Sequence, residues 1–161
     1  MRGLQLSLPA NPRGNNEDAL LLTLAGLAIG FVVSALAQEQ NTVDPEVHQQ
    51  IEAALVKFEE AFNKHDAAAM AALFTLDAVQ VLDWGEGGTF SGQQAIEEHY
   101  GVDFASSPPE FVEKLIHLYA IGDKISAISE WSHGKSKGRH ARIYVRDLDT
   151  WKIRMDYAMH L

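Results

Sequence analysis

Apolar residues after position 43 first recur at helical spacing, three and four positions apart. Residues 44–64 have this pattern, which predicts an amphipathic helix with Asp44 as its N-cap and Pro45 at its first position. Asp66 is placed to cap a second, short helix that is rich in alanine and runs to about residue 74.

The segment that follows alternates as a strand does. In "AVQVLD", the side chains of Val79, Val81 and Asp83 share one face. A glycine-rich loop comes next. Ser91, with Gln94 three residues later, then has the form of a capping box and predicts a third helix.

Beyond residue 110 the pattern changes to short strands separated by turn residues. Strands are predicted at 111–120, 124–132, 139–146 and 150–159. The order of two helices, a strand, a helix and four strands predicts an α+β fold. In this fold, three N-terminal helices pack on one face of a strongly bent antiparallel sheet.

The N-terminal segment predicts export. Residues 19–37 are apolar and uncharged, and the "ALA" that ends them has the small-x-small form of a signal-peptidase site. We therefore predict a signal peptide at 1–37, cleaved after its last residue, a polar linker at 38–43 and a single domain at 44–161. The mature protein would be periplasmic or secreted, without a membrane segment. Because the apolar stretch is long enough to span a bilayer, an uncleaved anchor is the alternative.

Composition restricts the chemistry. The chain of 161 residues has a formal net charge of -9 and no block of Lys or Arg, which argues against a nucleic-acid partner. It contains no cysteine, so disulfides, thiolate metal sites and cysteine nucleophiles are excluded. The histidines are scattered over separate predicted elements, and the glycine-rich loop lacks the context of a phosphate-binding loop. We therefore predict neither a metal nor a cofactor.

Three segments are similar, in their order and spacing, to one known group of proteins. They are "FEEAFNKHDAAAMAALFTLDAVQV" (58–81), "GQQAIEEHY" (92–100) and "YVRDLDTWKIRM" (144–155). Together they resemble the nuclear transport factor 2-like superfamily, most closely its SnoaL-like bacterial branch. The resemblance implies a cone-shaped, cystatin-like fold with one internal pocket, and a homodimer formed through the outer face of the sheet. It leaves the activity open, because the superfamily holds isomerases, dehydratases, polyketide cyclases, binding proteins and assembly modules.

Asp83 is the first candidate for chemistry. If the valine face points into the core, this carboxyl group is buried there, and burial raises its pKa and makes it a better base. Ketosteroid isomerase, a member of the superfamily, has its general-base aspartate in a context similar to "VLDWGEG", and the match falls on Asp83. Its oxyanion-donor tyrosine corresponds to Phe58, which has no hydroxyl group. Steroid isomerisation by that mechanism is therefore not expected.

Arg142 is the second candidate, because it corresponds to a protonated aspartic acid of the isomerase. His140, Arg142 and Tyr144 share one face of their predicted strand. If the register of the superfamily holds, Arg142 faces the pocket beside Asp83. It would then stabilise an anionic oxygen or, alternatively, form a structural ion pair with Asp83 that closes the pocket.

Six residues are candidates for contact with a ligand, because the pockets of this fold are largely aromatic and aliphatic. They are Phe58, Trp84, Tyr100, His117, His140 and Tyr144.

Three functions remain open at this point. The first is an exported SnoaL-like protein whose apolar pocket binds a small apolar or carbonyl-containing ligand. The second is a cofactor-independent isomerase, cyclase or dehydratase with Asp83 as general acid or base and Arg142 as anion stabiliser. The third, a structural oligomerisation domain, predicts a pocket filled by its own side chains.

Overall fold

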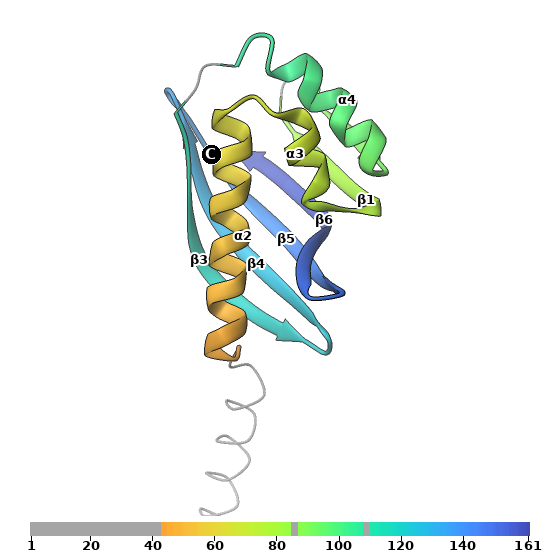
Figure 1. Ribbon diagram of the computed structural model, residues 1–161. Coiled ribbons are helices and arrows are strands. Elements are labelled where there is room, and N and C mark those ends of the chain that lie inside the picture. The colour runs from red at the N-terminus through yellow and green to blue at the C-terminus, as the bar shows by residue number, and fades with distance from the viewer. Residues whose placement is uncertain (1–42, 85–86, 108–109) are drawn as a thin grey trace, which may run out of the picture. The chain divides into compact units, whose positions relative to one another are not determined.

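The computed structural model describes residues 43–84, 87–107 and 110–161 (Figure 1). The predicted signal peptide at 1–37 and nearly all of the predicted linker at 38–43 lie outside the described residues. Within the described part of the chain, none of the helices is both long and apolar enough to cross a membrane.

Helices α2 (Pro45–Asn63), α3 (Ala67–Ala72) and α4 (Gln93–Asp103) lie on one face of a curved sheet (Figure 1). The predicted caps of the first two helices are confirmed. The Asp44 side chain accepts a hydrogen bond from the backbone N–H of Glu46 at 2.7 Å, and Asp66 accepts one from Ala69 at 2.9 Å. Each bond satisfies an N–H group that has no partner within its own helix.

The predicted start of the third helix is wrong. Ser91 belongs to a short strand, and the N-cap of α4 is Gly92, which makes no side-chain capping bond. Gly92 has a φ of 87°, a conformation that glycine adopts without steric cost. The turn therefore selects glycine at this position, and the serine is left one residue too early to cap the helix.

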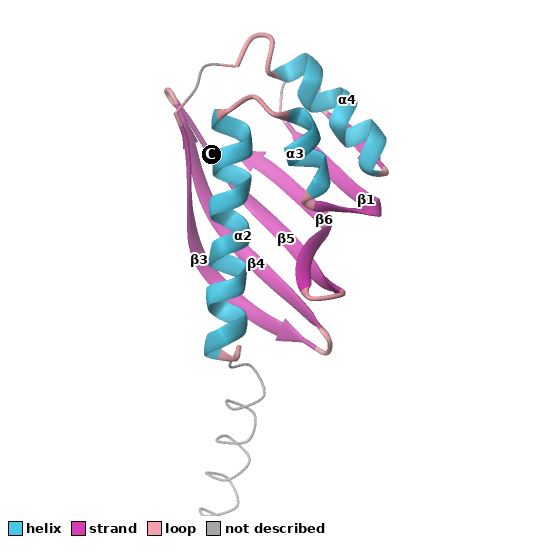
Figure 2. Cartoon of the chain, in the orientation of Figure 1, coloured by secondary structure: helices cyan, strands magenta, loops and turns pink. Residues whose placement is uncertain are grey.

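The described residues form six strands in the order β2-β1-β6-β5-β4-β3 (Figure 2). Their bounds are β1 (Phe74–Asp83), β2 (Gly88–Ser91), β3 (Phe111–Ile121), β4 (Lys124–His133), β5 (Ser136–Asp147) and β6 (Thr150–His160). The four C-terminal strands are confirmed as an antiparallel meander. The expectation of a wholly antiparallel sheet is wrong, because β1 joins the free edge of this meander parallel to β6. The α+β fold itself is as predicted, with a mixed sheet.

One face of α2 packs into the sheet through residues at helical spacing. Ile51, Leu55, Phe58 and Phe62 are buried, and Phe58 is 1 % exposed. Each such side chain contributes about 1.5–3 kcal/mol of burial free energy. The helix therefore forms because its apolar stripe matches the concave face of the sheet.

The end of α2 also fixes the start of β3. The side-chain amide of Asn63 donates to the backbone carbonyl of Phe111 at 2.8 Å, and its oxygen accepts from the N–H groups of Glu110 and Phe111 at 2.9 and 2.8 Å. The rings of Phe62 and Phe111 stack with their centroids 4.5 Å apart. These contacts place two aromatic side chains along one wall of a cavity.

Candidate functional site

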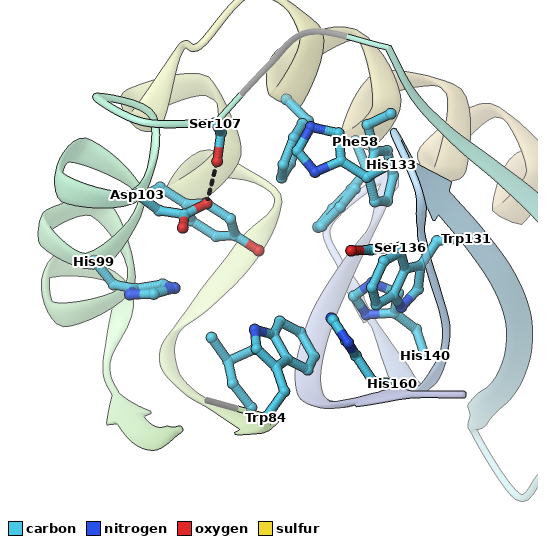
Figure 3. A pocket seen from close by; sticks show the side chains of 14 residues that line it. Phe58, Trp84, His99, Asp103, Ser107, Trp131, His133, Ser136, His140 and His160 are labelled. Carbon is cyan, nitrogen blue, oxygen red and sulfur yellow. Dashed lines mark hydrogen bonds between the residues drawn. The ribbon is translucent and has the colours of Figure 1, made fainter. Parts of the chain in front are cut away.

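A cavity of about 150 Å³ lies between the helices and the inner face of the sheet (Figure 3). Its walls are mainly aromatic rings and imidazoles, with a few hydroxyl and carboxyl groups. The lining residues are Phe58, Phe62, Leu82, Trp84, His99, Tyr100, Asp103, Ser107, Phe111, Trp131, His133, Ser136, His140 and His160. A cavity of this volume accommodates a molecule about as large as benzene.

Trp131 forms one wall because of the residue beside it. Trp131 on β4 pairs with Gly138 on β5, and a Cβ atom at position 138 would lie 2.2 Å from Cζ2 of the indole. Only glycine leaves room for the ring to lie over the neighbouring strand. The indole then packs against Trp84 and His160, with ring centroids 5.7 and 5.1 Å away.

A histidine and an aspartate form a hydrogen-bonded pair at the cavity. His140 Nδ1 lies 2.8 Å from Asp156 Oδ1, and both side chains are almost completely buried. Alternation along β5 turns His140 inward, and register with β6 brings Asp156 beside it. Because an ionised carboxylate can only accept, Nδ1 carries the ring proton whenever Asp156 is charged. In the neutral imidazole Nε2 is then the ring nitrogen with the lone pair, and His140 is one of the residues that line the cavity.

Asp156 is hydrogen-bonded to three side chains. Besides His140, Arg142 Nε donates to Oδ1 at 3.2 Å and Gln80 Nε2 donates to Oδ2 at 3.1 Å. Burial by itself would raise the pKa of Asp156, but attraction to His140 in its protonated form and to Arg142, together with these hydrogen bonds, lowers it to about 2. Asp156 is therefore a carboxylate at neutral pH.

Arg142 connects Asp156 to a second buried carboxylate. Its Nη1 donates to the two oxygens of Glu113 at 2.8 and 3.0 Å, and its guanidinium carbon lies 4.0 Å from the centre of the Phe58 ring. The Ser129 hydroxyl also donates to Glu113. Burial opposes a charge on Arg142, but the two carboxylates outweigh it and raise its pKa. The guanidinium is thus a permanent cation between two anions.

Asp83 does not face this cavity. It is exposed, and its Oδ2 accepts a hydrogen bond from the Tyr157 hydroxyl at 2.7 Å. The inward positions of β1 are Ala78 and Gln80, which are fully buried, so Val79 and Asp83 lie on the opposite face. The expectation that Asp83 points into the core is therefore wrong, and so is the expected pair between Asp83 and Arg142.

The other predicted residues divide into two groups. Phe58, Trp84, Tyr100 and His140 line the cavity. Tyr144 is buried at 1 % exposure but is not among the lining residues, and His117 is exposed on the edge strand β3. A bulge between Leu115 and His117 shifts the alternation there.

Three buried polar residues of the site were not predicted from the sequence: Gln80, Asp156 and Glu113. A signal existed for two of them: Gln80 shares a strand face with Ala78, and Asp156 shares one with Ala158. A polar residue between apolar positions of one strand face is a candidate for a buried, functional group. Within the described residues, no group of three or more His, Asp or Glu side chains could hold a metal ion.

The arrangement of a mixed, curved sheet under three helices is that of cystatin-like and nuclear transport factor 2-like (NTF2-like) proteins. A family model described as the SnoaL-like domain matches residues 55–156. This match spans more than half of the chain, and the chain therefore belongs to the SnoaL-like domain family. A search of the curated proteins found no match.

Solved structures with this fold are similar over most of the domain at low sequence identity. A ketosteroid isomerase-like protein from Erwinia carotovora atroseptica superposes with a TM-score of 0.62 at 16 % identity, covering 73 % of this chain and 98 % of its own. A proposed dehydratase of the NTF2-like family from Streptomyces avermitilis gives 0.59 at 17 %, covering 73 % and 99 %. A proposed calcium/calmodulin-dependent protein kinase type II association domain from Thiobacillus denitrificans gives 0.60 at 18 %, covering 68 % and 94 %. At these identities the likeness establishes the fold alone.

The low pKa of Asp156 predicts that acid destabilises the domain. This carboxyl group titrates at about 2 when folded and near 3.9 when unfolded. The ionised Asp156 thus adds about 2–3 kcal/mol to the free energy of unfolding above about pH 4, and this contribution is lost as pH falls through 2. Urea unfolding of the wild type and of Asp156→Asn at pH 7, 4 and 2.5 measures it. The wild type should lose more stability than the variant, and equal losses would contradict the prediction.

Proposed function

We propose that this SnoaL-like domain is a cofactor-independent enzyme that binds a small organic molecule in its cavity and moves a proton on it. His140 is the base, and Asp156 orients it. The observation that carries the proposal is the 2.8 Å bond from His140 Nδ1 to a buried, charged Asp156 at the wall of the cavity. This bond directs the other ring nitrogen towards a bound molecule.

The surroundings of the dyad support this role. The buried charges of Glu113 and Arg142 balance each other, and Asp156 then remains as an anion that stabilises a protonated His140. Burial also lowers the pKa of His99, which lies on the wall formed by α4, although the nearby Asp103 opposes this shift. The lowered pKa favours a neutral imidazole at this wall. Two structural neighbours bear the names of enzymes that move protons on their substrates. They are a ketosteroid isomerase-like protein and a proposed dehydratase.

Hydrogen–deuterium exchange tests the proposal without knowledge of the natural substrate. Single-ring compounds with a C–H acidified by a carbonyl group are incubated with the protein in D₂O, and loss of the α-proton signal is followed by NMR. We expect exchange above the buffer rate for at least one compound, and a reduction of about 10²-fold or more in His140→Gln. Binding without exchange in the wild type would leave a ligand-binding protein and overturn the enzymatic role.

The matched control for this assay is His117→Gln. His117 is exposed and does not line the cavity, so its replacement should leave the exchange rate unchanged. An equal reduction in the two variants would indicate that His140 has no special role.

We also propose that two copies of the domain associate through the outer face of the sheet. Val112, Tyr119 and Ile121 on β3 and Met155 on β6 are exposed, at strand positions that alternate with buried or half-buried ones. Exposed apolar residues gathered on one face favour a partner surface of the same kind. Sedimentation equilibrium measures the mass, and a monomer at all concentrations would reject the dimer.

We further propose that the mature protein is exported after cleavage behind Ala37. The proposal is supported by the apolar run at 19–37 and the small residues that end it. N-terminal sequencing of the protein recovered outside the cytoplasm tests it, and a chain that retains residue 19 would reject the cleavage.

A further inference from the structure

The hydrogen bonds around Asp156 determine which way the side-chain amide of Gln80 faces. Gln80 is fully buried, and its Nε2 lies 3.1 Å from Asp156 Oδ2 and 2.8 Å from the Tyr100 hydroxyl oxygen. A carboxylate only accepts hydrogen bonds, so the NH₂ side of the amide must face Asp156. Its two N–H groups are then both used, one on Asp156 and one on Tyr100.

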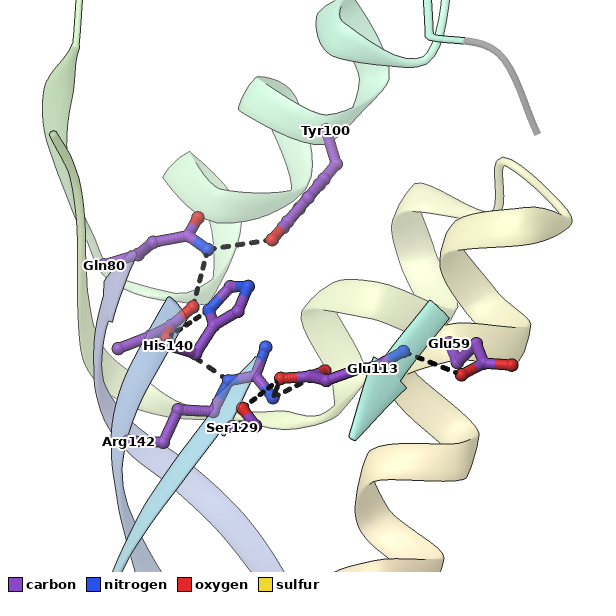
Figure 4. Close-up of polar contacts among 8 residues, drawn as sticks. Glu59, Gln80, Tyr100, Glu113, Ser129, His140 and Arg142 are labelled. Atoms are coloured by element: carbon purple, nitrogen blue, oxygen red, sulfur yellow. Dashed lines mark hydrogen bonds and ion pairs between the residues drawn. The ribbon is translucent and has the colours of Figure 1, made fainter. Parts of the chain in front are cut away.

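This orientation leaves the proton of the Tyr100 hydroxyl available. The hydroxyl oxygen accepts from Gln80, so its own O–H group is directed elsewhere. Tyr100 lines the cavity, and its hydroxyl points from α4 towards Gln80 and the region of His140 (Figure 4). Burial and the negative charge of Asp156 raise the pKa of Tyr100, so it stays protonated at neutral pH. The structure thus offers a neutral donor near the base.

We propose that Tyr100 is a catalytic hydrogen-bond donor to a substrate oxygen, and that Gln80 is the positioning residue that ties this donor to the His140–Asp156 pair. The inference rests on the proposed function and adds the class of substrate. The expected position of an oxyanion donor on the first helix holds Phe58, which has no hydroxyl group. In this chain the donor comes from α4 instead.

The size of the cavity, the Tyr100 hydroxyl and the His140 base together favour one class of substrate. It is a small cyclic ketone with one six-membered ring. The volume of about 150 Å³ matches one such ring, and the aromatic walls favour an apolar skeleton. Tyr100 binds the carbonyl oxygen, and His140 reaches the C–H beside it.

The reaction step balances without a co-reactant. His140 Nε2 takes the proton from the α-carbon, the C–H electron pair forms the C=C bond, and the carbonyl pair moves onto the oxygen. The Tyr100 O–H group stabilises the resulting enolate by its hydrogen bond and keeps its own proton. The proton on His140 then returns to the same carbon or to the far end of a conjugated enolate.

The experiment compares two ligands of the same shape, cyclohexanone and methylenecyclohexane, which differ in having C=O or C=CH₂. Dissociation constants are measured by NMR titration of the full mature domain. We expect the wild type to prefer the ketone by about 2- to 13-fold, the effect of one hydrogen bond. The preference should fall to about 1 in Tyr100→Phe and also in Gln80→Met. A loss of packing alone would weaken both ligands equally.

Tyr157→Phe is the matched control, since it removes a hydroxyl that bonds Asp83 outside the cavity, and it should keep the preference. No preference in the wild type, or an unchanged one in Tyr100→Phe, would overturn the inference. If Tyr100→Phe does not fold, Gln80→Met decides by the same ratio. A wild type that prefers the ketone but exchanges no α-proton would reject His140 as a base and leave the oxygen site standing.

Discussion

Replacing Arg142 with methionine is expected to lower the free energy of unfolding by about 3–5 kcal/mol at pH 7. Arg142 is 1 % exposed and lies between the carboxylates of Glu113 and Asp156, whose side chains have no exposed area. The substitution keeps much of the side-chain volume against Phe58 but leaves two buried anions without their shared cation. Urea unfolding at pH 7 measures the effect.

Arg139→Met is the control for this prediction. Its partner is Glu130, and both side chains of that pair are about half exposed, at 48 % and 45 %. Such a pair contributes about 1 kcal/mol or less. The double variant Glu113→Gln/Arg142→Met, which removes one of the two stranded charges, should recover part of the loss. A loss for Arg142→Met as small as that for Arg139→Met would show that the buried cation does not hold this cluster together.

Much of the fold could be predicted from local patterns. Asp44 and Asp66 cap their helices as predicted because a cap depends on a few neighbouring residues. The four C-terminal strands follow from alternation and turn residues. The parallel pairing of β1 with β6 could not be predicted in this way, because it joins residues more than 70 positions apart.

The candidate site could be predicted only in part, because alternation defines two faces of a strand without saying which is inward. On β1 the larger valines suggested the wrong face. The face with Ala78 is the one that packs against the helices, and Gln80 is buried with it. On β5 the prediction that Arg142 faces the pocket depended on the register of the superfamily, and both His140 and Arg142 are buried. Their actual partner, Asp156, depends on the register between strands, which local patterns do not contain.

The second large effect is expected for Asp156→Asn, which should reduce α-proton exchange by about 10²–10⁴-fold. The loss of the anion removes the charge that stabilises protonated His140. A second consequence follows from the hydrogen bonds. The asparagine carbonyl replaces Oδ1 as acceptor for His140 and Arg142, so its NH₂ group faces Gln80 in place of Oδ2.

Gln80 must then turn its own carbonyl towards that NH₂ group, and the same oxygen faces the Tyr100 hydroxyl. The Tyr100 proton is captured by Gln80 and is no longer offered to a ligand. Asp156→Asn should therefore abolish the preference for cyclohexanone over methylenecyclohexane, although residue 156 is not a lining residue of the cavity. A variant that loses exchange but keeps the preference would show that the base and the oxygen donor are independent. Loss of both would show that the orientation of one buried amide couples them.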